Sequence, residues 1–318
     1  MQKNSKIVLD YYTQDEIAYP SLTHNYSYLS QISTDSYTLD AEGEVMGTAP
    51  SAAVAFANKK KIQTYAAVSN WQGHDFSPEL AHQIISVPKV KKATIANLLQ
   101  VVKSNGFKGI NIDFESVAAR DRKAFSSFTA DVATAMKARG YLTMISVPAK
   151  FTDDPSNDWD GAFDFKALGK CADYIQVMTY DQHGPWGEPG PVAGKDWVGE
   201  ALQYAVSAIP ASKVIMGIAS YGYDWNVSKH SGTTVGLKDI PTLVKATHAV
   251  PLWDKVSFSM HFDYQDPEGS DHVVWYENAA SIQEKTHDTL TYHIAGVSIW
   301  SMGTEDQEFF KAMAAGLK

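Results

Sequence analysis

The sequence lacks the features that mark several classes of protein. Its single cysteine, Cys171, excludes a fold built on disulfides within the chain. It has no run of about 18 apolar residues, which a membrane-spanning helix needs, and no apolar stretch of signal-peptide length behind the first basic residues. It also has no low-complexity tract and no linker rich in serine, glycine and proline. We therefore expect a soluble, unanchored globular protein.

Positive charge is scarce, because 27 basic residues face 36 acidic ones and the net charge is −9. This balance argues against a phosphate-binding surface and so against a nucleic-acid partner. The ten histidines show no HxH or HExxH spacing, and a CxxC pair is impossible. We expect no metal, no cofactor, no membrane contact and a monomeric protein.

What the chain does contain is an alternation of short β-branched runs with amphipathic helical stretches. The helical pattern is clearest at 92–104, which Gly106 terminates, and at 117–138. Further helices are predicted near 78–86, 196–208, 276–287 and 305–315. Strands are predicted at 7–12, 28–33, 62–69, 109–115, 142–147, 174–180, 213–219 and 295–300.

Eight strands separated by helices indicate an α/β fold, a (β/α)8 TIM barrel, in a single catalytic domain over 1–318. The alternative is an open doubly wound sheet, but the glycine-rich turn expected after its first strand is missing. The even spacing fails between strands seven and eight, where 223–275 is rich in turn formers and aromatics. We interpret that stretch as a small insertion after strand seven, on the catalytic face.

The segment 109–115, Gly-Ile-Asn-Ile-Asp-Phe-Glu, carries the strongest chemical signal. Side chains alternate along a strand, so Asn111, Asp113 and Glu115 share one face, about 6.6 Å apart in sequence order. Two carboxylates at such a separation disfavour simultaneous ionisation, which raises one pKa and makes that group an acid near neutral pH. The alternative is an edge strand with a polar face, which the flanking helical patterns disfavour.

Two other strands end in candidate ligand-binding residues. The strand 174–180 places Tyr180 and, at its end, Asp181 near the mouth of a barrel, although its inward residues also suit plain core packing. Trp300 ends the last strand, either as a flat platform for the apolar face of a sugar or as a core aromatic. The remaining candidates, each equally compatible with packing, are Gln176, Met178, Trp71, Trp186 and Tyr221.

Residues 109–115 resemble the DGxDxDxE signature of glycoside hydrolase family 18, the chitinase-like enzymes. Met178-x-Tyr180-Asp181 is similar to that family's sixth-strand motif, and Trp300 matches the tryptophan of its last strand. Lys108 and Asn111 depart from the signature, and the Asn-x-Asp-x-Glu variant resembles the bacterial spore-cortex-lytic and peptidoglycan N-acetylglucosaminidases. The likeness extends from Ile7 to about Gly303.

The resemblance implies a retaining glycosidase that cleaves β-1,4 bonds at N-acetylglucosamine, in which the substrate's own acetamide is the nucleophile. Glu115 is implied as the proton donor, Asp113 as the group that holds the acetamide, and Tyr180 as the donor to its oxygen. Trp300 is implied as the floor under the distorted sugar, and Asn111 as a hydrogen-bond partner of Asp113. The implied lining of the sugar site is Asp181, Gln176 and Met178.

The implied polymer is peptidoglycan or spore cortex, which leads us to expect an extracellular, wall- or spore-associated protein. Chitin or chitooligosaccharides are the competing substrates. A second class of function is a chitinase-like carbohydrate-binding protein without catalysis. The presence of both Asp113 and Glu115 favours the hydrolase.

Overall fold

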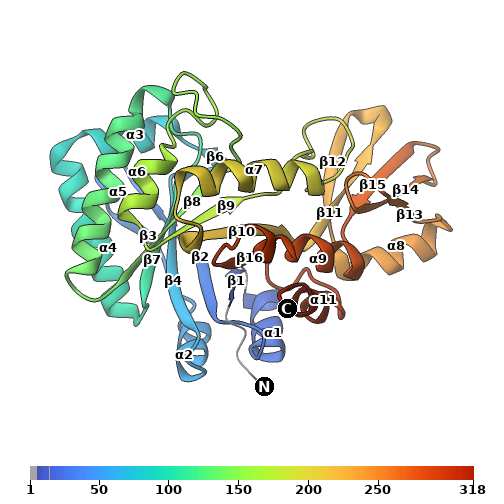
Figure 1. Cartoon of the computed structure of the whole chain (residues 1–318), viewed down its shortest axis with the longest axis horizontal. Helices are drawn as coiled ribbons and strands as arrows, with labels where there is room; N and C mark the ends of the chain where they lie inside the picture. Colours follow the sequence, from blue (N-terminus) through green and yellow to red (C-terminus); the bar gives the residue numbers. More distant parts are fainter. Residues whose placement is uncertain (1–5, 14) are drawn as a thin grey trace.

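The computed structural model describes residues 6–13 and 15–318, and its centre is a closed barrel of eight parallel strands. The strands are adjacent in the order β1-β16-β10-β9-β8-β7-β4-β2, and pairing of β1 with β2 closes the ring. The predicted TIM barrel is confirmed, with all eight predicted strands present (Figure 1). Their bounds are β1 Ile7–Tyr12, β2 Gln31–Leu39, β4 Gln63–Ser69, β7 Gly109–Asp113, β8 Leu142–Pro148, β9 Tyr174–Met178, β10 Val214–Ala219 and β16 Gly296–Trp300.

The helices surround the barrel, and six of them lie where the sequence pattern predicts them. These six are α3 Pro78–Ser86, α4 Pro88–Asn105, α5 Arg122–Lys137, α7 Lys195–Ala208, α9 Ala279–Thr286 and α11 Phe309–Gly316. Gly106 ends α4 in the left-handed conformation, with φ 73°, as its position predicts. The pattern alone did not predict α1 Asp15–Asn25, α2 Ser51–Lys59, α6 Phe165–Cys171, α8 Ile240–Thr247 or α10 Asp288–Thr291.

Several predicted boundaries differ from the structure by a few residues, among them the following three. The helix predicted from residue 117 begins at Arg122, because a loop and a short 3-10 turn, Ala119–Asp121, come first. The strand predicted at 28–33 starts later and runs longer, as β2. The strand predicted to reach residue 115 ends at Asp113, so Glu115 lies in the loop beyond β7.

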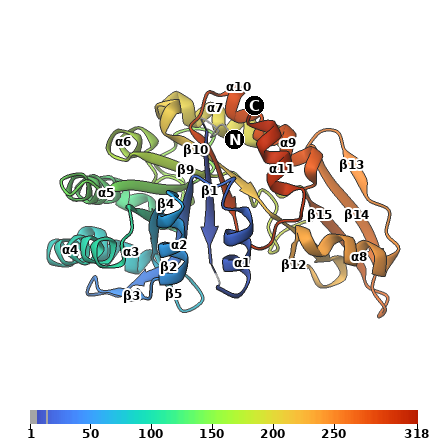
Figure 2. The ribbon, with the colours of Figure 1, turned by 90° about the horizontal axis from the view of Figure 1, so that it is seen from below.

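Between β10 and α9 the chain forms a second sheet, which is antiparallel and lies beside the barrel (Figure 2). Its strands are ordered β12-β11-β15-β14-β13, and α8 belongs to the same stretch. The bounds are β11 Tyr221–Asn226, β12 Ser231–Gly236, β13 Leu252–Asp254, β14 Ser259–Gln265 and β15 Asp271–Tyr276. The division of the chain into one domain with an insertion at 223–275 stays a prediction.

The apolar core lies mainly between the barrel and its helices. Ile110, Ile112 and Phe114 of the β7 segment belong to this core, and Phe114 stacks on Phe125 and Phe128 of α5 with ring centroids 6.2 and 5.7 Å apart. The opposite face of β7 therefore points into the barrel, as the alternation predicts. Over the described residues, no helix is long and apolar enough to cross a membrane.

Candidate active site

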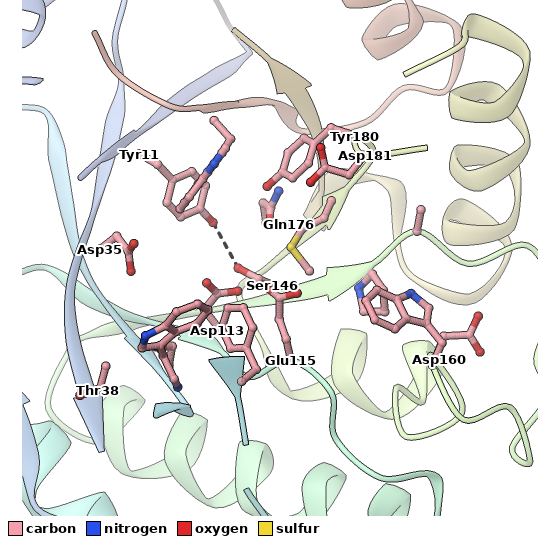
Figure 3. A pocket seen from close by; sticks show the side chains of 18 of the residues that line it. Tyr11, Asp35, Thr38, Asp113, Glu115, Ser146, Asp160, Gln176, Tyr180 and Asp181 are labelled. Atoms are coloured by element: carbon pink, nitrogen blue, oxygen red, sulfur yellow. Dashed lines mark hydrogen bonds between the residues drawn. The ribbon is translucent and has the colours of Figure 1, made fainter. Parts of the chain in front are cut away.

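A cavity of about 780 Å³ opens at the carboxyl ends of the barrel strands (Figure 3). This is the end of a TIM barrel at which enzymes of this architecture keep their catalytic residues. Nine of the eleven predicted site residues line it. They are Asp113, Glu115, Gln176, Met178, Tyr180, Asp181, Trp71, Trp186 and Trp300. Asn111 and Tyr221 do not line the cavity.

Glu115 is held at the cavity through its backbone. The side chain of Asn70, at the end of β4, accepts a hydrogen bond from the Glu115 N–H at 2.9 Å and donates one to the Glu115 carbonyl at 2.8 Å. The next residue, Ser116, has a φ of 54°, in the left-handed region, so the chain turns sharply there. The paired contact fixes the position from which the Glu115 carboxyl enters the cavity.

Asn111 lies below the cavity floor, fully buried, in a network that spans the barrel. Its Oδ1 accepts hydrogen bonds from the hydroxyls of Tyr11 at 2.9 Å and Ser33 at 3.0 Å, and its Nδ2 donates to Ser146 Oγ at 3.0 Å. The hydrogen bond expected between Asn111 and Asp113 is not formed. The Asn111 amide is already satisfied by Ser146, which itself hydrogen-bonds Asp113.

The pKa values of both carboxyls are raised. Burial raises the pKa of Asp113 to about 7, the charge of Asp35 adds to this, and the hydrogen bond from Ser146 opposes it. Burial also raises the pKa of Glu115 well above its usual range, and the charges of Asp113, Asp181 and Asp35 act in the same direction. One carboxyl of the pair therefore retains a proton near neutral pH, which is the state a general acid needs.

On the opposite wall, Asp181 follows β9 in the left-handed conformation, with φ 59°. Its Oδ1 accepts hydrogen bonds from the hydroxyls of Tyr221 at 2.6 Å and Tyr223 at 2.8 Å, both on β11 of the second sheet. The expected contact of Tyr221 with substrate is thus replaced by a supporting position behind Asp181. No residue of the second sheet lines the cavity, so this sheet acts on the site indirectly: through Asp181, and through hydrogen bonds from Trp225 and Gly232 to the carbonyls of Gly184 and Pro185, next to Trp186.

Tyr180 lies on the same wall as Asp181, and its hydroxyl points toward the middle of the cavity in Figure 3. Burial is the main cause that raises its pKa well above the ordinary value, so the hydroxyl keeps its proton and remains a donor. Gln176, below it, donates to Ser298 Oγ at 3.0 Å, while its Oε1 has no hydrogen-bond partner among the described residues. Gln176 lines the cavity, although this oxygen itself is buried.

Aromatic rings form much of the remaining lining. Trp300 packs on Tyr11 with ring centroids 5.3 Å apart, and Trp71 meets the edge of Phe76 at 5.1 Å. Trp186 stands at the rim and is 75% exposed. Flat exposed rings of this kind suit the apolar faces of sugar rings.

Sequence reasoning missed several residues of the cavity, including Tyr11, Asp35, Ser146, Asp160 and Trp159. Tyr11 could have been predicted, because the alternation of side chains along 7–12 places it on the inward face of the strand together with Leu9. Asp35 was missed because the predicted strand ended at residue 33, whereas β2 continues to Leu39 and places Asp35 on the same inward face as Ser33. Asp160 and Trp159 lie in a loop after β8 with no periodic pattern. In the described part of the chain, no group of three or more potential metal ligands lies together.

A parallel barrel with paired carboxyls and aromatic rings at the carboxyl ends of its strands is typical of a glycoside hydrolase, and comparison with known families agrees. Residues 6–305 match the family "Glycosyl hydrolases family 18", so the chain belongs to that family and is a glycoside hydrolase. The family resemblance of the signature segment is thereby confirmed.

The relatives include both cortex-lytic enzymes and chitinases. The chain is 42% identical to the "Uncharacterized glycosylase YvbX" of Bacillus subtilis, over 99% of this chain and 93% of that protein. It is 29% identical to the "Cortical fragment-lytic enzyme" of Bacillus cereus, over 87% of this chain but only 65% of that protein, less than two thirds.

Solved structures give the same two groups. A chitinase from Chromobacterium violaceum superposes with a TM-score of 0.93 at 37% identity, covering 98% of this chain and 99% of that one. The spore cortex-lytic enzyme SleL of Bacillus cereus superposes with a TM-score of 0.93 at 25% identity, covering 100% and 76%.

Proposed function

We propose that the protein hydrolyses β-1,4 bonds at N-acetylglucosamine with retention of configuration, using the substrate's acetamide as the nucleophile. The observation that carries the proposal is the pair Asp113 and Glu115 at one wall of the cavity, both with raised pKa values. In this scheme Glu115 donates its proton to the glycosidic oxygen, and the acetamide oxygen attacks the anomeric carbon to form an oxazolinium ion.

The other cavity residues suit the charges that develop in that step. Asp113 accepts a hydrogen bond from the acetamide N–H and balances the positive charge of the oxazolinium ion. Tyr180, whose hydroxyl stays protonated, donates to the acetamide oxygen and orients it for attack. After the leaving group departs, the Glu115 carboxylate removes a proton from a water molecule, which attacks the anomeric carbon and opens the oxazolinium ring.

Trp300 and Asp181 would hold the sugar during this step. Trp300 presents a ring supported by Tyr11 beneath the reacting sugar, while Asp181 accepts hydrogen bonds from its hydroxyls. Gln176 and Met178 line the same subsite. Asn111 acts from below, as a positioning residue behind Asp113 and not as a group that contacts substrate.

For the polymer, we propose peptidoglycan or its cortex form, with the protein acting outside the cytoplasm at the wall or spore. The support is the similarity to a cortical fragment-lytic enzyme and to SleL. Chitin is the second candidate, and the 37% identity to a solved chitinase favours it. A purely carbohydrate-binding role is disfavoured, because the chain keeps both carboxyls.

The test is digestion of purified sacculi, spore cortex and chitooligosaccharides, with mass spectrometry of the new reducing ends. New reducing N-acetylglucosamine from sacculi or cortex supports the proposal, whereas products from chitin alone overturn the choice of polymer. The Glu115→Gln variant should lose at least about a hundredfold in kcat, because it cannot donate the proton. Full turnover by that variant would refute the assignment of Glu115.

A further inference from the structure

The end of the barrel opposite the cavity carries an arc of positive charge, on a molecule whose net charge is −9. Four segments, 58–62, 103–108, 137–142 and 170–173, connect helices to the strands that follow. Together they hold eight cationic residues and one acid, Asp173. We call the eight the basic arc, and all are exposed. They are Lys59, Lys60, Lys61, Lys103, Lys108, Lys137, Arg139 and Lys170.

The arc is continuous because its segments precede four neighbouring strands, β4, β7, β8 and β9. Helices α4, α5 and α6, which lead into three of these segments, lie side by side in Figures 1 and 2. Asn58 Nδ2 donates to the Gly106 carbonyl at 2.9 Å, and the Leu142 N–H donates to the Lys108 carbonyl at 3.0 Å. Since packed helices lie about 8–10 Å apart, four helix ends span roughly 30 Å.

The favourable position of a cation in the last turn of a helix explains only half of these charges. A cation in the last turn of a helix interacts favourably with the helix dipole, which accounts for Lys59, Lys103, Lys137 and Lys170. The other four, Lys60, Lys61, Lys108 and Arg139, lie beyond the helix ends. Two of them also make local contacts that leave their charge unpaired: Arg139 donates to the Ala135 carbonyl at 3.2 Å, and Lys60 lies 4.1 Å from the ring centroid of Tyr26. The other segments that lead from a helix into a barrel strand show no such excess, since 26–30 holds no lysine or arginine and 209–213 holds only Lys213.

The charges of the basic arc are also not neutralised by the protein. Among the described residues, none of the eight forms an ion pair, whereas Lys91 pairs with Asp131 and Lys195 with Glu284 on other surfaces. Their charges are therefore available to an external anion. At 0.15 M salt the Debye length is about 8 Å, so neighbouring cations of the arc act together on one anionic chain.

The composition of the arc selects among polyanions. A bilayer is disfavoured because none of the large exposed apolar side chains of the described residues lies in the four segments. Nucleic acid is disfavoured because the arc has one arginine and no exposed aromatic ring on which a base could stack. A flexible polymer with carboxylates along its length needs only the distributed point charges that lysine provides.

We propose that the basic arc binds the carboxylates of peptidoglycan and holds the enzyme on its polymer while the cavity, at the opposite end, acts on another strand. The choice of peptidoglycan as the partner rests on the proposed function. The arc thus acts as a wall-binding surface built into the catalytic barrel itself.

The test compares two variants that lose the same charge. The arc variant carries K60Q, K61Q, K108Q and R139Q, which leaves the last-turn cations in place. The control variant carries K92Q, K123Q, K245Q and K255Q, four exposed lysines outside the arc. Both are made in the parent and in the Glu115→Gln background, the latter so that sacculi stay intact while cosedimentation is measured.

We expect the protein to bind sacculi at 50 mM salt and release them at 500 mM. The arc variant should bind at least about tenfold more weakly, because each cation near a polyanion contributes severalfold. The control variant should bind like the parent. Neither of these two proteins should bind sacculi whose carboxylates have been chemically amidated. Turnover of a short chitooligosaccharide should be equal in the parent, the arc variant and the control variant, each measured with Glu115 in place.

Equal binding by the arc and control variants overturns the inference, and so does arc-dependent binding to phosphatidylglycerol vesicles or duplex DNA without binding to sacculi. Failure of the proposed function looks different, because the parent would then release no product from any substrate containing N-acetylglucosamine. Arc-dependent binding to sacculi would stand apart from that result.

Discussion

Asp35 adds negative charge to the cavity and influences both carboxyls of the proposed reaction. It lines the cavity, and its charge raises the pKa of Asp113 and of Glu115. The Asp35→Asn variant should therefore lower the pKa of Glu115. Since Glu115 acts only while protonated, the basic limb of the kcat/KM profile should move to lower pH.

The measurement is kcat/KM against pH on a soluble chitooligosaccharide. Asp160→Asn is the matched control, because Asp160 lines the same cavity but is not among the charges that raise either pKa. Its basic limb should stay with the parent. If Asp35→Asn leaves the limb in place or moves it to higher pH, the electrostatic role of Asp35 is wrong.

Asn111 gives a second prediction at the scale of one residue. An aspartate there would still accept hydrogen bonds from Tyr11 and Ser33, but it could not donate to Ser146. Ser146 would then be free to donate to the new carboxylate, and the added charge would raise the pKa of Asp113 further. We expect Asn111→Asp to retain activity with its pH–rate profile shifted to higher pH. Identical profiles for variant and parent would contradict this.

At the scale of secondary-structure elements, the second sheet holds Asp181 through two hydroxyls. Tyr221 and Tyr223 of β11 both donate to Asp181, and a hydrogen bond to a charged acceptor is worth about 1.5–3 kcal/mol. Tyr221→Phe and Tyr223→Phe should each lower kcat/KM by roughly tenfold or more, because Asp181 loses the contacts that keep it ionised and oriented.

The control for this prediction is Tyr264→Phe. Tyr264 lies in the same sheet and donates to Asp224 at 2.6 Å, away from the cavity. That variant should lose some thermal stability but keep kcat/KM on a chitooligosaccharide. Equal losses of activity in all three variants would mean that the sheet acts by general stability and not through Asp181.

The barrel strands and the residues they carry could be predicted from the sequence only in part. Period-two alternation identified the barrel strands and the inward face of Asn111 and Asp113, because a covered parallel strand leaves few other arrangements. It did not identify Asp35, because the predicted strand ended at residue 33 and β2 continues to Leu39. Nor did it place Tyr221 behind Asp181, because that contact joins β11 to the loop after β9 through tertiary packing alone.

At the scale of the whole molecule, a net charge of −9 conceals two ends of opposite character. The cavity is lined by Asp35, Asp113, Glu115, Asp160 and Asp181, and no lysine, arginine or histidine is among its described lining residues. The basic arc occupies the other end. Positive charge is therefore scarce in the molecule as a whole but concentrated at the end that carries the basic arc.

The buried carboxyls also set how stability depends on pH. Burial raises the pKa values of Asp10, Asp35, Asp113, Glu115 and Asp181. The folded state then binds more protons than the unfolded state above about pH 4, so the free energy of unfolding falls as pH rises toward the folded pKa values. The carboxyls with lowered pKa values, Asp153, Asp154, Asp254 and Asp266, oppose this only weakly because they lie near the surface.

We therefore expect the Tm, measured by calorimetry, to fall between about pH 5 and pH 8. Asp10 offers the cleanest test, because it is fully buried within β1, does not line the cavity, and has its pKa raised by burial and by the charge of Glu305. Each unit by which its folded pKa exceeds the unfolded value is worth about 1.4 kcal/mol once the group ionises. Asp10→Asn cannot ionise at this position, so its Tm should fall less steeply with pH than that of the parent.

The exposed control Asp263→Asn should keep the parent's slope of Tm against pH. A Tm that rises over this interval, or an Asp10→Asn variant with an unchanged slope, would show that buried carboxyls do not govern the stability of the barrel.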